Sequence, residues 1–193
     1  MLPGPTTVRK CSRCAGLVMQ GSLSSGNTFG ASYWTDGRCI APMLPEQPWL
    51  VKCPHCAAVG WVEDWQEVGV IQPFEVPEAG FETAEGVKEP AMEDYLQVLE
   101  RGIEDSEKCE YARVHAWWAG NDERRGDSPP PAARSARELA NLEALAQDFQ
   151  AGEGGRLLMG AEALRQLGRF GEALATLARV KEPELANAKK LLT

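Results

Sequence analysis

Two short cysteine pairs limit what this chain can fold into more than any other part of its sequence. Cys11 and Cys14 form one pair, Cys53 and Cys56 form the other, and 38 residues separate the two pairs. The two residues between the thiols of a pair allow a tight turn that aims both sulfurs at one ion. Two such turns supply four thiolates in a tetrahedron, the usual ligand set of a structural zinc ion. The sequence therefore predicts a Zn²⁺ site at these four cysteines, with no open position for catalysis.

The residues around the two pairs are alike. A lysine precedes each pair (Lys10 and Lys52), and two small residues follow it (Ala15-Gly16 and Ala57-Ala58), which let the chain turn back past the sulfurs. These knuckles resemble the zinc-ribbon family, over the knuckles and about 65 residues of the chain. The resemblance implies a small antiparallel β-unit closed by the metal. The chain departs from the common family pattern in two ways: alanine replaces glycine after each second cysteine, and the intervening segment is long.

Residues in and near the knuckles also have possible roles other than metal binding. A thioredoxin-like redox pair is the alternative for either knuckle, but no βαβ pattern surrounds them. His55 lies inside the second knuckle and is expected to point away from the ion, toward the surface. Cys39 could replace one of the four ligands, but it precedes Ile40 on an expected strand, where a small core residue is the simpler interpretation.

The segment between the pairs is expected to hold its own structure. Asp36-Gly37 separates two β-prone runs, which is a hairpin signal because both residue types tolerate positive φ. Closing a flexible loop of this length costs about 3 kcal/mol. Zinc bound by four thiolates contributes on the order of 10–16 kcal/mol, so the long segment does not prevent the site from forming.

Charge divides the chain. Residues 1–62 carry five basic and two acidic side chains, and residues 63–193 carry 15 basic and 26 acidic ones, so net charges of +3 and −11 make up the total of −8. The acidic excess is densest from Glu75 to Asp94, where prolines and glycines are also frequent. This composition predicts an extended connector. We therefore expect a zinc-ribbon β domain at 1–72, an acidic connector at 73–90 and a helical domain at 91–193.

The apolar spacing changes to a helical period after residue 92. Residues 93–119 predict two helices or one bent helix, with the break expected at 102–106. The helical segment is expected to end near Gly120 in a left-handed terminal conformation. The Pro-rich segment 126–131 predicts a stiff loop. Ser135 and Glu138 form a capping-box pattern that predicts the start of another helix. The fold class expected from the whole chain is α+β.

The last segment, residues 157–177, resembles one tetratricopeptide repeat. Ala161 and Ala173 match its small positions, Gly168 its inter-helix turn, and Phe170 and Leu177 its groove-filling residues. The resemblance implies a TPR-like helical bundle and a protein-binding groove, although no second repeat is found at the 34-residue period. The chain as a whole resembles bacterial proteins that join a zinc ribbon to a helical tail, a resemblance that implies no particular activity.

The function expected from these features is a non-enzymatic, zinc-binding adaptor with a protein partner. The alternatives are a nucleic-acid-associated ribbon and, less favoured, a thiol redox enzyme. Four thiolates and Zn²⁺ together add −2, so the basic N-terminal unit keeps only about +1 to attract phosphates. No apolar run approaches the roughly 18 residues of a membrane span and no signal-peptide core is present, so a cytoplasmic protein without membrane contact is expected.

Overall fold

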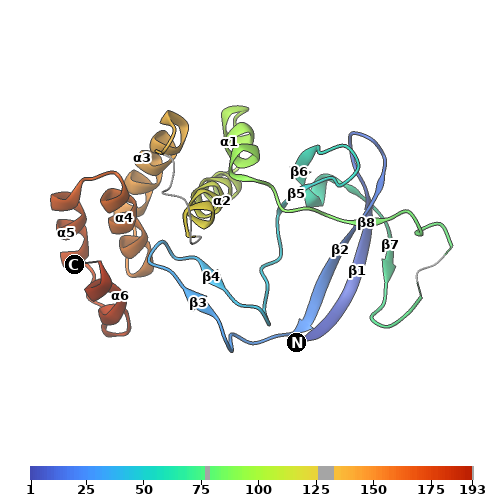
Figure 1. Cartoon of the computed structure of the whole chain (residues 1–193), viewed down its shortest axis with the longest axis horizontal. Helices are drawn as coiled ribbons and strands as arrows, with labels where there is room; N and C mark the ends of the chain where they lie inside the picture. Colours follow the sequence, from blue (N-terminus) through green and yellow to red (C-terminus); the bar gives the residue numbers. More distant parts are fainter. Residues whose placement is uncertain (77–78, 126–132, 193) are drawn as a thin grey trace. The chain divides into compact units, whose positions relative to one another are not determined.

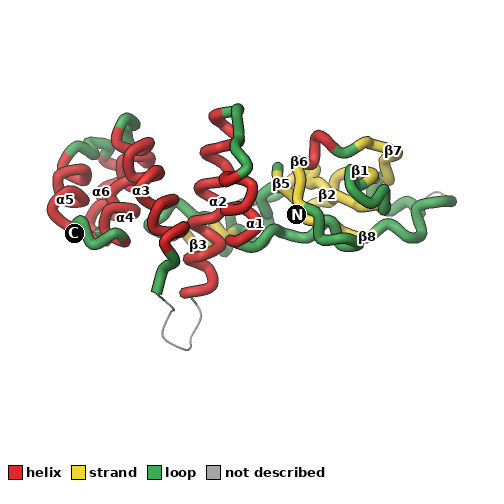
Figure 2. The backbone as a smooth tube through the Cα atoms, turned by 90° about the horizontal axis from the view of Figure 1, so that it is seen from above, coloured by secondary structure: helices red, strands yellow, loops and turns green. Residues whose placement is uncertain are grey.

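A computed structural model describes residues 1–76, 79–125 and 133–192, and it confirms the α+β class (Figures 1 and 2). The chain forms two compact units. The first, here called the ribbon unit, comprises Met1–Ser32 and Ile40–Pro90. The second, here called the helical unit, comprises Tyr33–Cys39 and Ala91–Thr193. The predicted Pro-rich loop at 126–131 lies outside the described residues.

The ribbon unit contains a four-stranded sheet and a separate two-stranded hairpin. The sheet has the order β7-β1-β2-β8, with β1 antiparallel to β2 and β7, and with β8 parallel to β2. The hairpin pairs β5 with β6, and a 3₁₀ turn at Val62–Asp64 leads from it to β7. The strands are β1 (Leu2–Lys10), β2 (Leu17–Ser25), β5 (Leu50–Lys52), β6 (Val59–Trp61), β7 (Gln66–Ile71) and β8 (Glu85–Gly86).

The first strand, β1, is difficult to predict from the sequence. β1 lies between β7 and β2, although prolines cannot donate to a ladder and are unusual in a central strand. Pro3 and Pro5 lie where the β1–β2 register shifts, and regular pairing begins at Thr6. The carbonyl of Pro5 accepts from the Ser22 hydroxyl at 2.6 Å. Side-chain bonding thus replaces part of the ladder in this stretch.

Part of the expected acidic connector is built into the ribbon unit. β8 pairs with β2, and Lys88 exchanges two backbone hydrogen bonds of 2.9 Å with Lys52. Val87 packs against the small core around Val18, Val51 and Trp65. The end of the acidic segment is thus ordered by two contacts, the packing of Val87 and the pairing of β8 with the edge of β2. Its composition had suggested an extended chain.

The helical unit contains six helices among the described residues. They are α1 (Met92–Glu100), α2 (Ser106–Arg124), α3 (Ala136–Gln150), α4 (Gly155–Gln166), α5 (Phe170–Ala178) and α6 (Ala186–Leu191), the last after a 3₁₀ turn at Pro183–Leu185. The break at 102–106 is confirmed, since Asp105 caps α2 by accepting from the N–H groups of Glu107 and Lys108. The capping box of Ser135 and Glu138 is confirmed as well.

The end expected for the second helix is wrong. α2 continues through Gly120 to Arg124, and Gly120 is buried within the helix rather than left-handed at its end. A Cβ at Gly120 would lie 2.7 Å from Met92 Sδ, so the glycine permits close approach to α1 instead of ending α2.

The core of the helical unit is formed mainly by α2, α3, α4 and α5. Its central cluster includes Trp117, Leu145, Phe149, Leu164 and Ala173. A second cluster joins α4 to α5 and the C-terminal turn; its buried members are Leu157, Leu158, Ala161, Leu177 and Val180.

The residues expected to form the tetratricopeptide-like repeat are buried in most cases, with Phe170 as an exception. Ala161, Ala173 and Leu177 are buried, and Gly168 has a φ of 76° in the turn between α4 and α5. The role expected for Phe170 is wrong, because this side chain is 62% exposed and fills no groove. No helix in the described ranges is long and apolar enough to cross a membrane.

The predicted Asp-Gly hairpin forms between β3 (Ser32–Tyr33) and β4 (Cys39–Ile40). Trp34 N–H donates to the Arg38 carbonyl at 2.9 Å, and Gly37 N–H donates to the Trp34 carbonyl at 3.0 Å. Gly37 has a φ of 82°, which gives a three-residue loop closed by a left-handed glycine. The expectation of a buried Cys39 is wrong, since Cys39 is exposed at the end of this hairpin.

Candidate metal centre

Each cysteine pair lies in the turn of its own hairpin. Cys11 and Cys14 follow β1 and precede β2, whereas Cys53 and Cys56 follow β5 and precede β6. In the first turn Cys11 N–H donates to the Gly16 carbonyl at 3.0 Å, and Ala15 N–H donates to the Cys11 carbonyl at 2.9 Å.

The second turn repeats this pattern. Cys53 N–H donates to the Ala58 carbonyl at 2.8 Å and Ala57 N–H donates to the Cys53 carbonyl at 3.0 Å. The two knuckles therefore share one hydrogen-bonding scheme, which follows from their shared spacing.

The alanine after each second cysteine has a left-handed backbone. Ala15 has a φ of 57° and Ala57 a φ of 56°. This conformation brings a Cβ close to the following carbonyl and costs about 1–2 kcal/mol in a residue other than glycine. Both knuckles use it to turn the chain back past the sulfurs, so the two departures from the usual glycine are two sites of backbone strain.

The four sulfurs meet in one place. All four Sγ atoms lie within 4.8 Å of one another. The distance is 3.8 Å from Cys11 to Cys56 and 3.8 Å from Cys14 to Cys53, in each case between sulfurs of different knuckles. A tetrahedral ion with metal–sulfur bonds of about 2.3 Å needs sulfur–sulfur edges of about 3.8 Å. The separations thus fit one tetrahedral ion, and a disulfide is far shorter, at about 2.05 Å.

The knuckles also determine how the thiols ionise. All six cysteines lie in the described part of the chain and are free thiols. Burial raises the pKa of Cys53 to about 12. Burial also opposes ionisation of Cys11, but N–H donors from Cys14 and Arg13 outweigh it and lower the pKa of Cys11 to about 7. At neutral pH, a metal bound by both sulfurs must therefore displace a proton held by Cys53.

His55 connects the two knuckles and does not take part in the sulfur cluster. Its Nε2 lies 2.8 Å from the Leu17 carbonyl, so this nitrogen carries the proton and donates. Its Nδ1 lies 3.5 Å from Glu85 of β8. The residue is exposed, as expected, but its ring packs over the first knuckle: a Cβ at Gly16 would lie 2.6 Å from His55 Cδ2 and 3.3 Å from Cys14 Sγ.

The metal centre borders the small core of the ribbon unit. Cys11 and Cys53 are buried members of that core, together with Val18, Val51 and Trp65. Cys14 is exposed, which gives the cluster one side toward solvent. An ion bound here would therefore link two buried sulfurs of this core and one exposed sulfur.

Sequence reasoning identified the four sulfurs and the small residues that follow each pair, but it missed the contacts that hold His55 against the first knuckle. The structure brings Cys11, Cys14, Cys53 and Cys56 together, and Cys39 and Cys109 are not members of this group. The small size of Gly16 was recognised from the sequence, but its contact with the His55 ring was not. Glu85 was missed, because no pattern in the sequence indicates that it faces His55.

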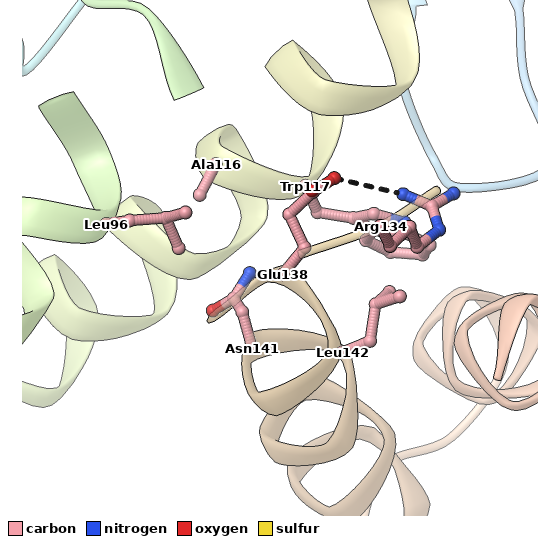
Figure 3. A pocket seen from close by; sticks show the side chains of 7 residues that line it. All are labelled: Leu96, Ala116, Trp117, Arg134, Glu138, Asn141 and Leu142. Carbon is pink, nitrogen blue, oxygen red and sulfur yellow. Dashed lines mark ion pairs between the residues drawn. The ribbon is translucent and has the colours of Figure 1, made fainter. Parts of the chain in front are cut away.

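A small cavity in the helical unit is a second candidate site (Figure 3). Its volume is about 10 Å³, room for about one water molecule. It is lined by Leu96, Ala116, Trp117, Arg134, Glu138, Asn141 and Leu142. Burial opposes the charge of Glu138, but the Ser135 N–H and the Arg124 guanidinium outweigh burial and lower the pKa of this carboxyl. The cavity is thus a polar packing defect that an ion pair stabilises, and it is too small for a substrate.

Comparison of the chain with protein-family models, with curated proteins and with solved structures finds no match. The likeness to a tetratricopeptide repeat and to bacterial proteins of the same arrangement therefore stays a prediction. What the structure carries by itself is a zinc-ribbon-like unit with four cysteines at metal-binding distance.

Proposed function

We propose that Cys11, Cys14, Cys53 and Cys56 bind one structural Zn²⁺ ion in a non-enzymatic adaptor protein. The observation that carries this proposal is the pair of 3.8 Å sulfur–sulfur distances between knuckles, which match the edges of a zinc–thiolate tetrahedron. Catalytic zinc keeps a position open for water or substrate, whereas four thiolates fill the shell.

The energetics support a structural role. The core cluster next to the knuckles has five buried residues, two of them ligand cysteines. Zinc binding on the order of 10–16 kcal/mol exceeds the roughly 3 kcal/mol needed to close the segment between the knuckles. The ion would therefore more than offset the cost of closing this segment and would stabilise the unit. Cysteines that are not in disulfides also suit a reducing compartment, in line with the cytoplasmic location predicted above.

The proposed protein partner is supported by apolar side chains left exposed on a helix. Phe170 and Leu174 lie one turn apart on α5 and are 62% and 51% exposed. Exposed apolar neighbours of this kind are typical of protein-binding surfaces. The TPR-like character of α4 and α5 belongs to this proposal, and buried Ala161 and Ala173 are compatible with it.

Metal analysis of the purified chain tests the first part of the proposal. We expect one zinc per chain and loss of the metal in Cys11→Ser and Cys53→Ser. Cys39→Ser and Cys109→Ser are matched controls that should retain it. Tetrahedral thiolate sites also accept iron, so iron at one equivalent would overturn the choice of metal while keeping the site. A metal-free chain with unchanged folding would overturn the site itself.

The two alternatives make different predictions. A nucleic-acid-associated ribbon should bind single-stranded DNA at low salt and release it steeply as salt rises. A thiol redox enzyme should turn over a disulfide substrate and lose this activity when Cys11 or Cys53 is alkylated in the metal-loaded protein. Absence of both activities in the zinc-loaded chain is the result that the adaptor proposal requires.

A further inference from the structure

The Asp36-Gly37 turn binds to the helical unit through one carboxylate. Asp36 is only 1% exposed. Its Oδ2 accepts from Asn121 Nδ2 at 2.6 Å and from the Arg125 guanidinium. Its main-chain carbonyl accepts from Trp118 Nε1 at 3.0 Å. Trp118, Asn121 and Arg125, all at the C-terminal end of α2, are here called the turn-binding site.

The rest of the hairpin contributes little buried surface. Asp36 is its one buried residue between Ser32 and Ile40, whereas Tyr33 and Trp34 are 70% and 43% exposed. Both strands of the hairpin are two residues long. The chain segments on either side of Tyr33–Cys39 belong to the ribbon unit. This arrangement is that of a short ligand held by one anchor rather than that of a core element.

The turn-binding site is held in place by groups other than the turn. Asn121 Oδ1 accepts from Arg134 Nη2 at 2.9 Å, which orients the amide so that its Nδ2 faces Asp36. Arg134 also donates to Gln166 Oε1 at 2.6 Å. Figure 3 shows Arg134 paired with Glu138 of α3. The network thus spans α2, α3 and α4 and pre-organises the donors that face the carboxylate.

A second layer of contacts anchors this network. Trp117 Nε1 donates to the same Gln166 oxygen at 2.9 Å, and Gln166 Nε2 donates to buried Glu162 at 2.7 Å. Arg125 is also paired with Asp122 on its own helix. Asp122 also lies 3.7 Å from Arg38 of the hairpin. The bonds of Asn121, Arg134 and Gln166 do not involve the hairpin, so the Asn121 amide should keep its position when the turn leaves.

The flanking residues add selectivity for a particular kind of turn. The Arg125 guanidinium lies 4.2 Å from the Trp34 ring centroid, and the Arg38 guanidinium lies 5.0 Å from that of Trp118. Gly37 has positive φ, and a Cβ there would lie 2.7 Å from Met159 Sδ. The site therefore fits an aspartate that follows an aromatic residue by two positions and precedes a glycine and then an arginine.

We propose that the helical unit carries a recognition site for acidic tight turns, and that the chain fills this site in cis with its own Asp36-Gly37 turn. A partner protein binds by presenting a turn of the same chemistry that displaces the internal one. This inference rests on the proposed adaptor function and names the chemistry of its partner. Charge-assisted hydrogen bonds from an arginine and an amide are the strong, directional contacts that such recognition needs.

The test uses the full-length, metal-loaded chain and a labelled synthetic peptide that spans residues 32–40, with Cys39→Ser to prevent oxidation. The peptide should bind saturably to the Asp36→Ala chain, whose site is open. It should bind at least tenfold more weakly to the wild-type chain, whose site is filled by its own turn. A peptide with Asp36→Asn is the matched control and should lose at least tenfold in affinity. Arg125→Ala added to Asp36→Ala should abolish binding.

The outcomes separate recognition from simple folding. Circular dichroism checks that Asp36→Ala keeps its helices, and Asp36→Asn provides a milder opening of the site if it does not. Loss of helices in both variants would overturn the proposal, because the turn would then be a core element. Equal binding of the two peptides, or none, would also overturn it. Zinc content measured on the same samples tests the metal centre independently, so either proposal can fail without the other.

Discussion

Replacing the two strained knuckle alanines with glycine should strengthen the metal centre. Ala15 and Ala57 have φ values of 57° and 56°. Relief of left-handed strain is worth about 1–2 kcal/mol per site. The greater conformational freedom of glycine in the unfolded chain reduces this stabilisation by about 0.5–1 kcal/mol per site. With the middle of each range, about 1.5 and about 0.75 kcal/mol, the net gain is about 0.75 kcal/mol for each substitution. It is about 1.5 kcal/mol for Ala15→Gly/Ala57→Gly if the two effects add.

Competition with a chelator is the appropriate assay, because folding of the ribbon and metal binding are coupled. A gain of about 1.5 kcal/mol corresponds to roughly tenfold tighter zinc binding at about 1.4 kcal/mol per factor of ten.

Ala58→Gly is the matched control, since Ala58 follows Ala57, packs against the core and is not among the positive-φ residues. It should weaken binding. If the double variant binds zinc no more tightly than the wild type, the argument from backbone strain is refuted.

Three further changes test other parts of the structure. Gly16→Ala places a methyl group against the His55 ring and should weaken zinc binding by tenfold or more in the same assay, whereas Gly21→Ala, with its nearest neighbour at 3.8 Å, should have little effect. Glu138→Gln should lower the free energy of unfolding by roughly 1–3 kcal/mol at pH 7, measured in urea, because Arg124 then loses a charged acceptor at 2.7 Å. The pKa of Glu138 is lowered in the folded state, so its contribution to the free energy of unfolding is present above its unfolded pKa of about 4.3. This contribution is lost as pH falls through the lower folded pKa. If the stability of the wild type does not fall more steeply with acid than that of the glutamine variant, this reasoning is contradicted. Chelation should abolish the near-ultraviolet signal of the ribbon tryptophans and leave most helical circular dichroism; loss of both together would mean that the two units fold only as one.

The metal centre was accessible to sequence reasoning because its chemistry is local. A knuckle needs only its own six residues to place two sulfurs, and both knuckles form the same turn. The helix starts at Asp105 and Ser135 were predictable for the same reason, since a cap acts within three residues of itself.

The errors concern positions where distant packing overrides local preference. Gly120 has the left-handed option at a helix end, but contact with Met92 makes it an interior residue of α2. β1 was missed because prolines mask a strand whose partners lie up to 65 residues away. The Asp-Gly turn was predicted correctly, yet nothing within the hairpin indicates that its carboxylate binds Asn121.

The position of this turn along the chain has a consequence for biosynthesis. The Asp36 carboxylate bonds to Asn121 and Arg125, which come 85 and 89 positions later in the chain. At about 5–20 residues per second, a ribosome needs roughly 4–17 s to add the first of them after Asp36. During that interval the aspartate stays hydrated, and the first knuckle is complete well before the helices exist. Closure of the turn onto α2 is therefore a late event of maturation, when any competing acidic turn in a neighbouring polypeptide has its earliest access to the same arginine.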